Sequence, residues 1–299
     1  NAVPYNPAPR AELMSDIISD KVYYYGGFGA SGTMNDFFYI DLTKSFYSFS
    51  PPYQFIKYLD YRGGGSANSD ANNIYFFGGY GISADSPPGE PYIIKSLSTD
   101  PVINYIQYTN STPSSRKWHT SVIDHTNKKM PSTSYTTLLP DERIIMIGGA
   151  FSSDVGQTAT KDGFIPPIGS HSATLLPDNQ NIIIYGGSNQ TNYSGLAVLN
   201  TAGYVWTVIF PTGNPPSVLT KSHKATLYLD VIIFTFGDYS LNNTRTFMDS
   251  TLRILNISNG QYRWVDSFTP IPTLPTLPTL SNQTSNTNLI IIVSIIGGL

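Results

Sequence analysis

Three of the four histidines recur at a fixed interval. They are His119, His171 and His223, and 52 residues separate each from the next. Imidazoles bind metal ions and transfer protons near neutral pH, so this series could form a metal or catalytic site. His171 and His223 also share a context, Ser-His-Ser-Ala-Thr and Ser-His-Lys-Ala-Thr. A residue repeated with its context is typical of a packing position in a repeated unit, and we favour that structural role.

Several other chemistries lack the residues that they need. The chain has no cysteine, which excludes disulfides, cysteine-based zinc sites and thiol catalysis. Glycine-rich stretches at residues 26–29 and 63–65 lack the Lys-Ser/Thr that follows in a phosphate-binding loop. The three glutamates, Glu12, Glu90 and Glu142, give no spacing typical of the paired carboxylates of a glycosidase.

The composition favours one large all-β domain. Charged residues make up 12 % of the 299 positions and aromatic residues 13 %, alongside 25 glycines and 22 prolines. Such a chain suits many short strands with tight turns, and it argues against coiled coils and disorder. The net charge of −3 provides no basic surface, so we expect no nucleic-acid partner.

An apolar run that ends in paired glycines recurs along the chain. Copies occupy residues 23–27, 74–79, 144–149 and 182–187, and a weaker copy at 232–238 keeps Gly237 but has lost its second glycine. Each run has strand length, and continuous apolarity predicts burial on both faces of a sheet. The glycines allow a positive φ and a close approach of neighbouring backbones.

The sequence around each run repeats as well. After the glycines come a polar loop, a third strand that ends in Asp or Asn, and an aromatic residue on a predicted fourth strand, which is Phe46, Trp206 or Trp264. Four strands with these markers resemble the kelch repeat, which implies a β-propeller with one repeat per blade. The implied structural positions are Gly26, Gly27, Gly78, Gly79, Gly148, Gly149, Gly186, Gly187, Gly237, Trp206 and Trp264.

The resemblance covers roughly residues 10–268 of a predicted propeller domain at 1–268, with one irregular stretch. Units near 11–50, 61–108, 169–210 and 221–268 are complete, whereas 114–168 holds an incomplete unit or lacks sequence, so we expect five or six blades. A propeller would set equivalent histidines far apart around its ring, which supports a packing role for them. The fold is shared with galactose oxidase, but the copper site of that enzyme needs a cysteine linked to a tyrosine, which this chain cannot form.

The C-terminal part differs in composition. Residues 269–288 are rich in Pro and Thr and then polar, which predicts an extended stalk or a plain linker. Residues 289–299 are uncharged and apolar, which indicates the start of a transmembrane helix, an anchor signal or a buried strand. Kelch units followed by such a stalk resemble the membrane-anchored kelch-repeat proteins of fungi. Glycosylation sequons lie at Asn110, Asn189, Asn192, Asn242 and Asn282, with a further, less favourable one at Asn256.

The sequence therefore predicts a non-enzymatic ectodomain, extracellular or lumenal and anchored to a membrane through its tail. We expect it to bind a protein or a carbohydrate through its loops, where Tyr80, Tyr193 and Tyr239 lie. No cofactor or metal is expected. An oxidase-like propeller enzyme and an intracellular kelch adaptor are the alternatives. The sequence does not identify the partner.

Overall fold

The chain forms an all-β structure built from many small antiparallel sheets. The computed structural model describes residues 5–70, 72–81, 168–188, 195–241 and 245–270, together with short strand segments between residues 92 and 164. Apart from one 3₁₀ turn at Ser258–Gly260, the regular elements of these residues are all strands. The predicted all-β class is confirmed.

Four larger sheets carry most of the described chain, and we name each by its first strand. The β1 sheet pairs β1 (Met14–Ile18), β2 (Lys21–Tyr25), β5 (Asp36–Asp41) and β7 (Gln54–Tyr58) in that order. The β8 sheet pairs β8 (Gly63–Ser69), β9 (Asn73–Tyr80), β10 (Tyr92–Lys95) and β11 (Val102–Tyr105). The β20 sheet pairs β20 (Ser172–Leu175), β21 (Asn181–Tyr185), β22 (Leu196–Asn200) and β23 (Val205–Val208). The β25 sheet pairs β25 (Lys224–Tyr228), β26 (Val231–Thr235), β29 (Leu252–Asn256) and β30 (Arg263–Val265), with β24 (Thr212–Gly213) parallel to β30.

Between β11 and β20 the structure describes only short strands. These strands pair only two by two, and they are β12 (Thr120–Ser121) with β13 (Ser132–Thr133), β14 (Thr136–Leu138) with β15 (Ile144–Met146), β16 (Ala150–Phe151) with β17 (Asp154–Val155), and β18 (Ala159–Thr160) with β19 (Gly163–Phe164). Strand β12 lies against β8 and strand β14 lies against β20. These strands therefore occupy the interval between the β8 and β20 sheets.

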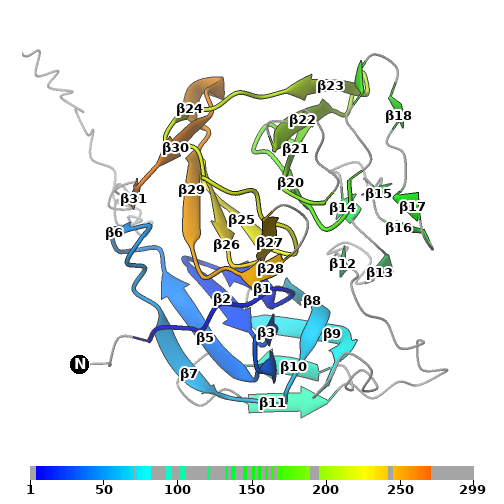
Figure 1. Ribbon diagram of the computed structural model, residues 1–299. Helices are drawn as coiled ribbons and strands as arrows, with labels where there is room; N and C mark the ends of the chain where they lie inside the picture. Colours follow the sequence, from blue (N-terminus) through cyan, green and yellow to red (C-terminus); the bar gives the residue numbers. More distant parts are fainter. Residues whose placement is uncertain are drawn as a thin grey trace, which may run out of the picture.

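The first strands of the larger sheets are neighbours in space. Strand β1 contacts both β8 and β25, and β25 contacts β20, so the last sheet lies beside the first (Figure 1). A further pair, β31 (Ser267–Phe268) with β6 (Phe46–Tyr47), joins the end of the described chain to the β1 sheet. Two hairpins complete the elements, β3 (Phe28–Gly29) with β4 (Gly32–Thr33) and β27 (Asp238–Leu241) with β28 (Arg245–Met248).

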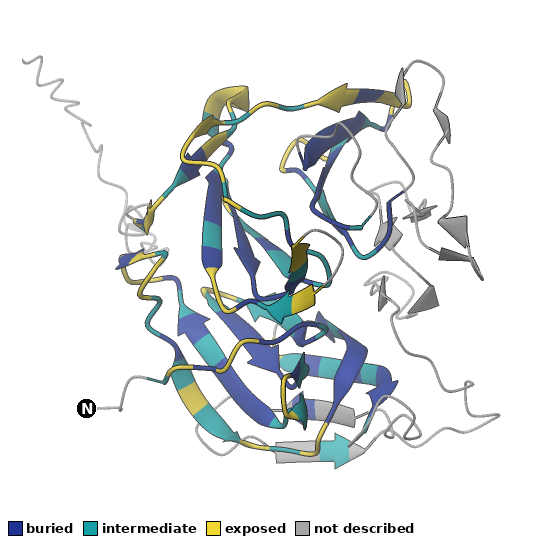
Figure 2. Cartoon of the chain, viewed as in Figure 1, coloured by how far each residue is buried: buried dark blue, intermediate teal, exposed yellow. Residues whose placement is uncertain are grey.

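The apolar runs at 23–25, 182–185 and 232–234 are buried on both faces, which confirms the expectation from their composition. In β9, in contrast, Ile74 and Phe76 are buried whereas Tyr75 and Phe77 are only partly buried. In β2, Val22 and Tyr24 pack into a cluster with residues of the β25 sheet, while Tyr23 and Tyr25 pack against Ile74 of the β8 sheet. Figure 2 shows the second and third strands as mainly buried, with exposure concentrated on outer strands and loops. Such clusters join the β1 sheet to the β8 and β25 sheets, and the β20 sheet to the β25 sheet, and this burial holds these adjacent sheets together.

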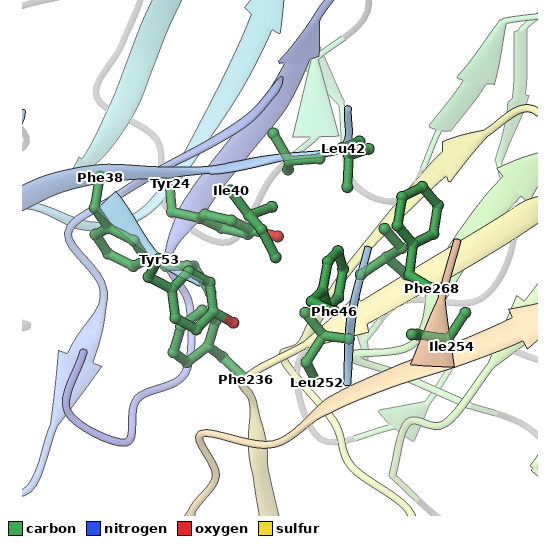
Figure 3. Close-up of a cluster of buried hydrophobic side chains, with 13 residues drawn as sticks. Tyr24, Phe38, Ile40, Leu42, Phe46, Tyr53, Phe236, Leu252, Ile254 and Phe268 are labelled. Carbon is green, nitrogen blue, oxygen red and sulfur yellow. The ribbon is translucent and has the colours of Figure 1, made fainter. Parts of the chain in front are cut away.

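The cluster between the first and last sheets is rich in aromatic rings. Tyr24, Phe38 and Tyr53 of the β1 sheet surround Phe236, with ring centroids 5.8–6.0 Å from it (Figure 3). Phe268 stacks on Phe46 at 5.1 Å. Fully burying one such side chain contributes on the order of 2–3 kcal/mol. This cluster stabilises the contact between sheets that are about 200 residues apart in sequence.

The fourth strands show one confirmed prediction and one error. Trp206 and Trp264 are buried on β23 and β30, opposite Leu199 and Leu255 of the third strands. Phe46, in contrast, lies outside the fourth strand of its sheet, which is β7 at Gln54–Tyr58. Phe46 pairs instead with Phe268, because an intervening loop places β7 later in the chain than the other repeats suggest.

Candidate functional site

A series of three backbone hydrogen bonds links the starts of four first strands. Glu12, Gly64, Ser170 and Ser222 occupy equivalent places and have φ of +58°, +68°, +57° and +54°. The Glu12 amide donates to Ser222 O at 3.0 Å, the Ser222 amide to Ser170 O at 2.8 Å, and the Gly64 amide to Glu12 O at 2.8 Å. This left-handed conformation turns each amide towards the preceding sheet, which explains why it recurs.

The glycine pairs form a second set of bonds between sheets. The second glycine of a pair donates to a carbonyl just before the next first strand, from Gly27 to Arg62 at 2.8 Å and from Gly187 to Thr220 at 3.0 Å. Gly237 donates to Arg10 at 2.8 Å and so connects the last sheet to the first. Gly78 and Gly79 also have positive φ. Gly148 and Gly149 lie outside the described residues.

The weak copy at 232–238 has lost its first glycine, not its second. Phe236 has φ +60°, close to Gly26 at +64° and Gly186 at +66°, whereas Gly237 at +102° matches Gly27 at +104° and Gly187 at +100°. The sequence analysis took Gly237 as the first glycine of the pair and the second as lost. The backbone conformation shows that Gly237 is the second glycine and that Phe236 occupies the place of the first. A bulky residue in this region is strained. Phe236 is held there by the rings and the Arg10 guanidinium packed around it.

His171 and His223 are packing residues in equivalent places. Each lies against the second glycine of its own sheet, and a Cβ built on Gly187 or Gly237 would meet a histidine Cβ at 3.0 or 2.9 Å. Leu13 stands in the same place beside Gly27, so a hydrocarbon side chain fits the position equally well. Burial lowers the pKa of His171 to about 4 and, together with Arg253, that of His223 to about 3.

The two histidines are closer than the sequence reasoning assumed. His223 Nε2 lies 2.8 Å from Oγ of Ser172, the residue after His171, so equivalent positions of adjacent sheets are in contact. The expectation that they lie far apart is wrong, because the first strands meet at the centre of the structure. His119 lies outside the described residues. Within those residues, no group of three or more His, Asp and Glu side chains is placed to hold a metal ion.

The residues after the glycine pairs differ from sheet to sheet. They are Phe28, Tyr80, Ser188 and Asp238, and each forms a bridge with a residue just before a first strand. The Tyr80 hydroxyl donates to Glu12, and the Phe28 and Tyr80 rings meet edge to face at 6.2 Å. A uniform backbone framework thus presents chemically different side chains at one end of the sheets.

Five of these central residues, Glu12, Tyr80, Lys221, Lys224 and Asp238, form what we name the hub cluster. Lys221 Nζ lies 3.3 Å from the Asp238 carboxylate. Burial raises the pKa of Asp238, with Lys221 acting in the opposite direction. Burial lowers the pKa of Lys224, which Glu12 and Asp16 oppose. Opposite charges beside a phenol in a partly desolvated place can orient a polar ligand.

The β27–β28 hairpin extends from the hub cluster at Asp238. Its Tyr239 and Phe247 rings stack at 5.5 Å with 17° between their planes, and the Arg245 guanidinium lies 4.9 Å from the centre of the Phe247 ring. Leu241 is exposed. Tyr239 was predicted as a loop residue for binding and lies on this hairpin. Tyr80 was predicted likewise but is buried, and Tyr193 lies outside the described residues.

Arg10 is the clearest residue that the sequence analysis missed. Its guanidinium is buried, lies 2.5 Å from the Asp36 carboxylate and donates to Gly26 O at 3.0 Å. It also lies 5.3 Å from the Phe38 ring centre and 5.7 Å from that of Phe236. Arg62 precedes the second unit as Arg10 precedes the first, and this recurrence was the available signal.

Several expectations concern parts of the chain that the structure does not describe. The sequons at Asn110, Asn189, Asn192, Asn242 and Asn282 lie there, as do the stalk from residue 271 and the apolar run at 289–299. The described residues contain no helix with the length and apolarity that crossing a membrane requires.

Comparisons with known proteins support the fold class. No family model matches the chain, and no curated protein matches its sequence. Among solved structures 155 chains match, so the architecture is widely shared. One of them, described as the structure of YjhT, has a TM-score of 0.58 at 10 % identity, and the match covers 88 % of this chain and 99 % of the other. At this identity the likeness concerns the fold alone, which is all-β and propeller-like.

Proposed function

We propose that the chain is a kelch-type β-propeller of five or six blades that acts as a non-enzymatic binding module. Its blades are scaffold, and its recognition surface combines the β27–β28 hairpin with the partly exposed residues of the hub cluster, Glu12, Lys221 and Lys224. The partner is a protein or a carbohydrate. One observation carries this proposal. The same backbone hydrogen bonds recur between neighbouring sheets, whereas the residues that follow the glycine pairs differ from sheet to sheet.

The kelch assignment rests on the recurring glycine pairs and on the order of contacts. The second glycines Gly27 and Gly187 donate to the next sheet, and the Gly237–Arg10 bond joins the last sheet to the first. Such contacts between neighbours are what a radial arrangement of blades requires. Trp206 and Trp264 pack inside this framework and His171 and His223 are buried in it, which supports a structural role for these residues and recognition by the loops.

The recognition surface has the composition expected of an interface. Stacked aromatic rings supply rigid contact area, and Arg245 with the Lys221–Asp238 pair supplies directional polar contacts. Aromatic residues and arginine are the side chains most often found at the energetic centre of interfaces. We further propose that the molecule is held at a membrane by its C-terminal run, with the propeller extracellular or lumenal, on the basis of the sequence of residues 269–299.

A binding screen on the full chain tests the recognition surface. The protein is applied to an array of defined glycans and to a displayed library of defined peptides, and Phe247→Ser is compared with the parent chain. Loss of one hot-spot aromatic is expected to weaken binding tenfold or more, since such residues contribute about 2 kcal/mol. Phe210→Ser is the control, because Phe210 is an exposed phenylalanine that lies beyond the outer strand β23. Phe247 is half-buried, so a melting curve checks that Phe247→Ser still folds.

The outcomes separate the proposal from its alternatives. Selective loss in Phe247→Ser supports the surface, whereas equal binding by both variants contradicts it. Chemical conversion of a bound ligand, detected by mass spectrometry, would instead support an enzyme.

A further inference from the structure

A group of buried polar side chains lies between the β20 and β25 sheets, and we name Tyr185, Thr220, Asp249 and Arg253 the interface cluster. Tyr185 ends β21 and is 1 % exposed, and Thr220 precedes β25 and is fully buried. Arg253 Nη2 lies 2.6 Å from Asp249 Oδ2, and both side chains are more than nine-tenths buried. Arg253 lies on the same face of β29 as Leu255, which packs with Tyr185.

Three polar atoms of the interface cluster have no hydrogen-bond partner among the residues that the structure describes. They are the Tyr185 hydroxyl, the Thr220 hydroxyl and Arg253 Nη1. Burial raises the pKa of Tyr185 to about 12, while Arg253 and the Thr220 hydroxyl lower it, so both groups lie close to the phenol oxygen. Unpaired buried polar atoms destabilise a fold. Native structures therefore pair such atoms with protein groups or with ordered water.

The equivalent interface between the β25 and β1 sheets is closed by an arginine. Thr220 and Arg10 occupy equivalent places, because their carbonyls accept from the corresponding glycines Gly187 and Gly237. The Arg10 guanidinium donates directly to backbone and carboxylate oxygens. At the β20–β25 interface a short threonine stands in that place, and the guanidinium of Arg253 comes from another strand with Nη1 unpaired. The two interfaces thus satisfy their polar groups in different ways.

We propose that one ordered water molecule bridges the Tyr185 hydroxyl, the Thr220 hydroxyl and Arg253 Nη1 and completes the contact between the β20 and β25 sheets. Polar groups that lie near one another without a direct hydrogen bond are typical hosts of a bridging water. A buried water makes about three hydrogen bonds, and three atoms are unpaired here. The water accepts from Arg253 Nη1, which can only donate, and it exchanges hydrogen bonds with the two hydroxyls, which donate and accept.

The charges of the interface cluster favour a neutral molecule over an anion. Arg253 is already paired with Asp249, so the cluster has no net charge. The His223 ring packs against Tyr185 with centroids 5.2 Å apart, and burial lowers the pKa of His223 to about 3, so this ring is neutral at pH 7. A bound anion would therefore bring an uncompensated charge into a desolvated place, which is costly.

This water site goes beyond the proposed binding function and is independent of the recognition surface. It makes the β20–β25 contact depend on a solvent molecule, whereas the contact between the β25 and β1 sheets depends on Arg10. A variant that loses the water should therefore keep the recognition surface unchanged.

Oxygen-17 magnetic relaxation dispersion on the full chain tests the proposal, because it counts the water molecules that a protein holds for longer than its rotational correlation time. We expect Tyr185→Phe combined with Thr220→Val to hold one such water fewer than the parent chain, since both hydroxyls are removed with little change of shape. Thr220→Ser keeps a hydroxyl and should keep the water. If a melting curve shows that the double variant does not fold, Thr220→Val against Thr220→Ser gives the same comparison.

Tyr25→Phe is the matched control. Tyr25 ends β2 just before a glycine pair, as Tyr185 ends β21, and it is buried, but its hydroxyl donates directly to Asp60 O. Its loss should not lower the number of long-lived waters. An equal number in the parent and in the hydroxyl-free variant overturns the proposal. It is also overturned if sodium chloride, compared with sodium gluconate at equal ionic strength, raises the melting temperature of the parent but not of that variant, because an anion would then occupy the site.

Discussion

Gly186 provides the sharpest test of the close backbone contacts that join neighbouring sheets. It has φ +66°, and a Cβ at this position would lie 2.1 Å from the Thr220 carbonyl oxygen and 2.8 Å from His223 Cε1. Gly186→Ala therefore carries two costs. The left-handed conformation costs an L-residue about 1 kcal/mol. The second cost arises because the Thr220 backbone must move away from the new methyl group.

The size of the second cost follows from the bonds that the movement breaks. Thr220 O accepts from the Gly187 amide at 3.0 Å, and the Gly186 amide donates to Gly195 O at 2.9 Å. Leaving a buried backbone group unpaired costs about 1–3 kcal/mol. We expect a total loss of about 3–6 kcal/mol in the free energy of unfolding, and a melting temperature lower by roughly 10 °C or more. Gly186→Val should lose still more, because its branched side chain needs more room than a methyl group.

Urea denaturation followed by circular dichroism measures this loss, and Gly260→Ala is the matched control. Gly260 has a similar φ of +71°, but a Cβ there meets no atom within 4 Å. Gly260→Ala should therefore lose only about 1 kcal/mol. If the two variants differ by less than 1 kcal/mol, the reasoning that Gly186 permits the close approach of the next sheet is refuted.

Three further predictions concern buried residues. The folded pKa values of His171 and His223 lie below the usual 6.5, so the unfolded chain binds more protons below pH 6.5 and stability falls as pH decreases from 6.5 towards 4. We expect each histidine to lower the free energy of unfolding by about 2–3 kcal/mol between pH 6.5 and pH 4. Replacing both by Leu, the residue at the equivalent position 13, should remove this decrease, which urea denaturation at several pH values measures. Phe236→Gly relieves a strained φ but removes a buried ring, so we expect a net loss of about 2–4 kcal/mol in the same assay, and a gain would contradict the packing role. Arg10→Met leaves the buried Asp36 without its cation and should cost about 3–5 kcal/mol at pH 7, whereas an unchanged midpoint would show that the pair is dispensable.

The local sequence was sufficient to identify the strands and the glycines. The residues of a run such as 182–187 predict its conformation, because continuous β-branched residues indicate a strand buried on both faces and paired glycines permit positive φ. The same signals correctly placed Trp206 and Trp264 on fourth strands. They failed at Phe46 and Phe236, where a long loop and a substituted glycine obscured the register of the repeat.

The hub cluster and the Arg10 contacts were decided only by the tertiary structure. Glu12 bonds to Ser222, and Gly237 bonds to Arg10, across more than 200 residues of sequence. Strand periodicity reports the environment of one segment, whereas these contacts depend on how the last sheet packs against the first. The sequence thus determined which residues build each sheet, and the packing of sheet on sheet determined which side chains meet at the centre.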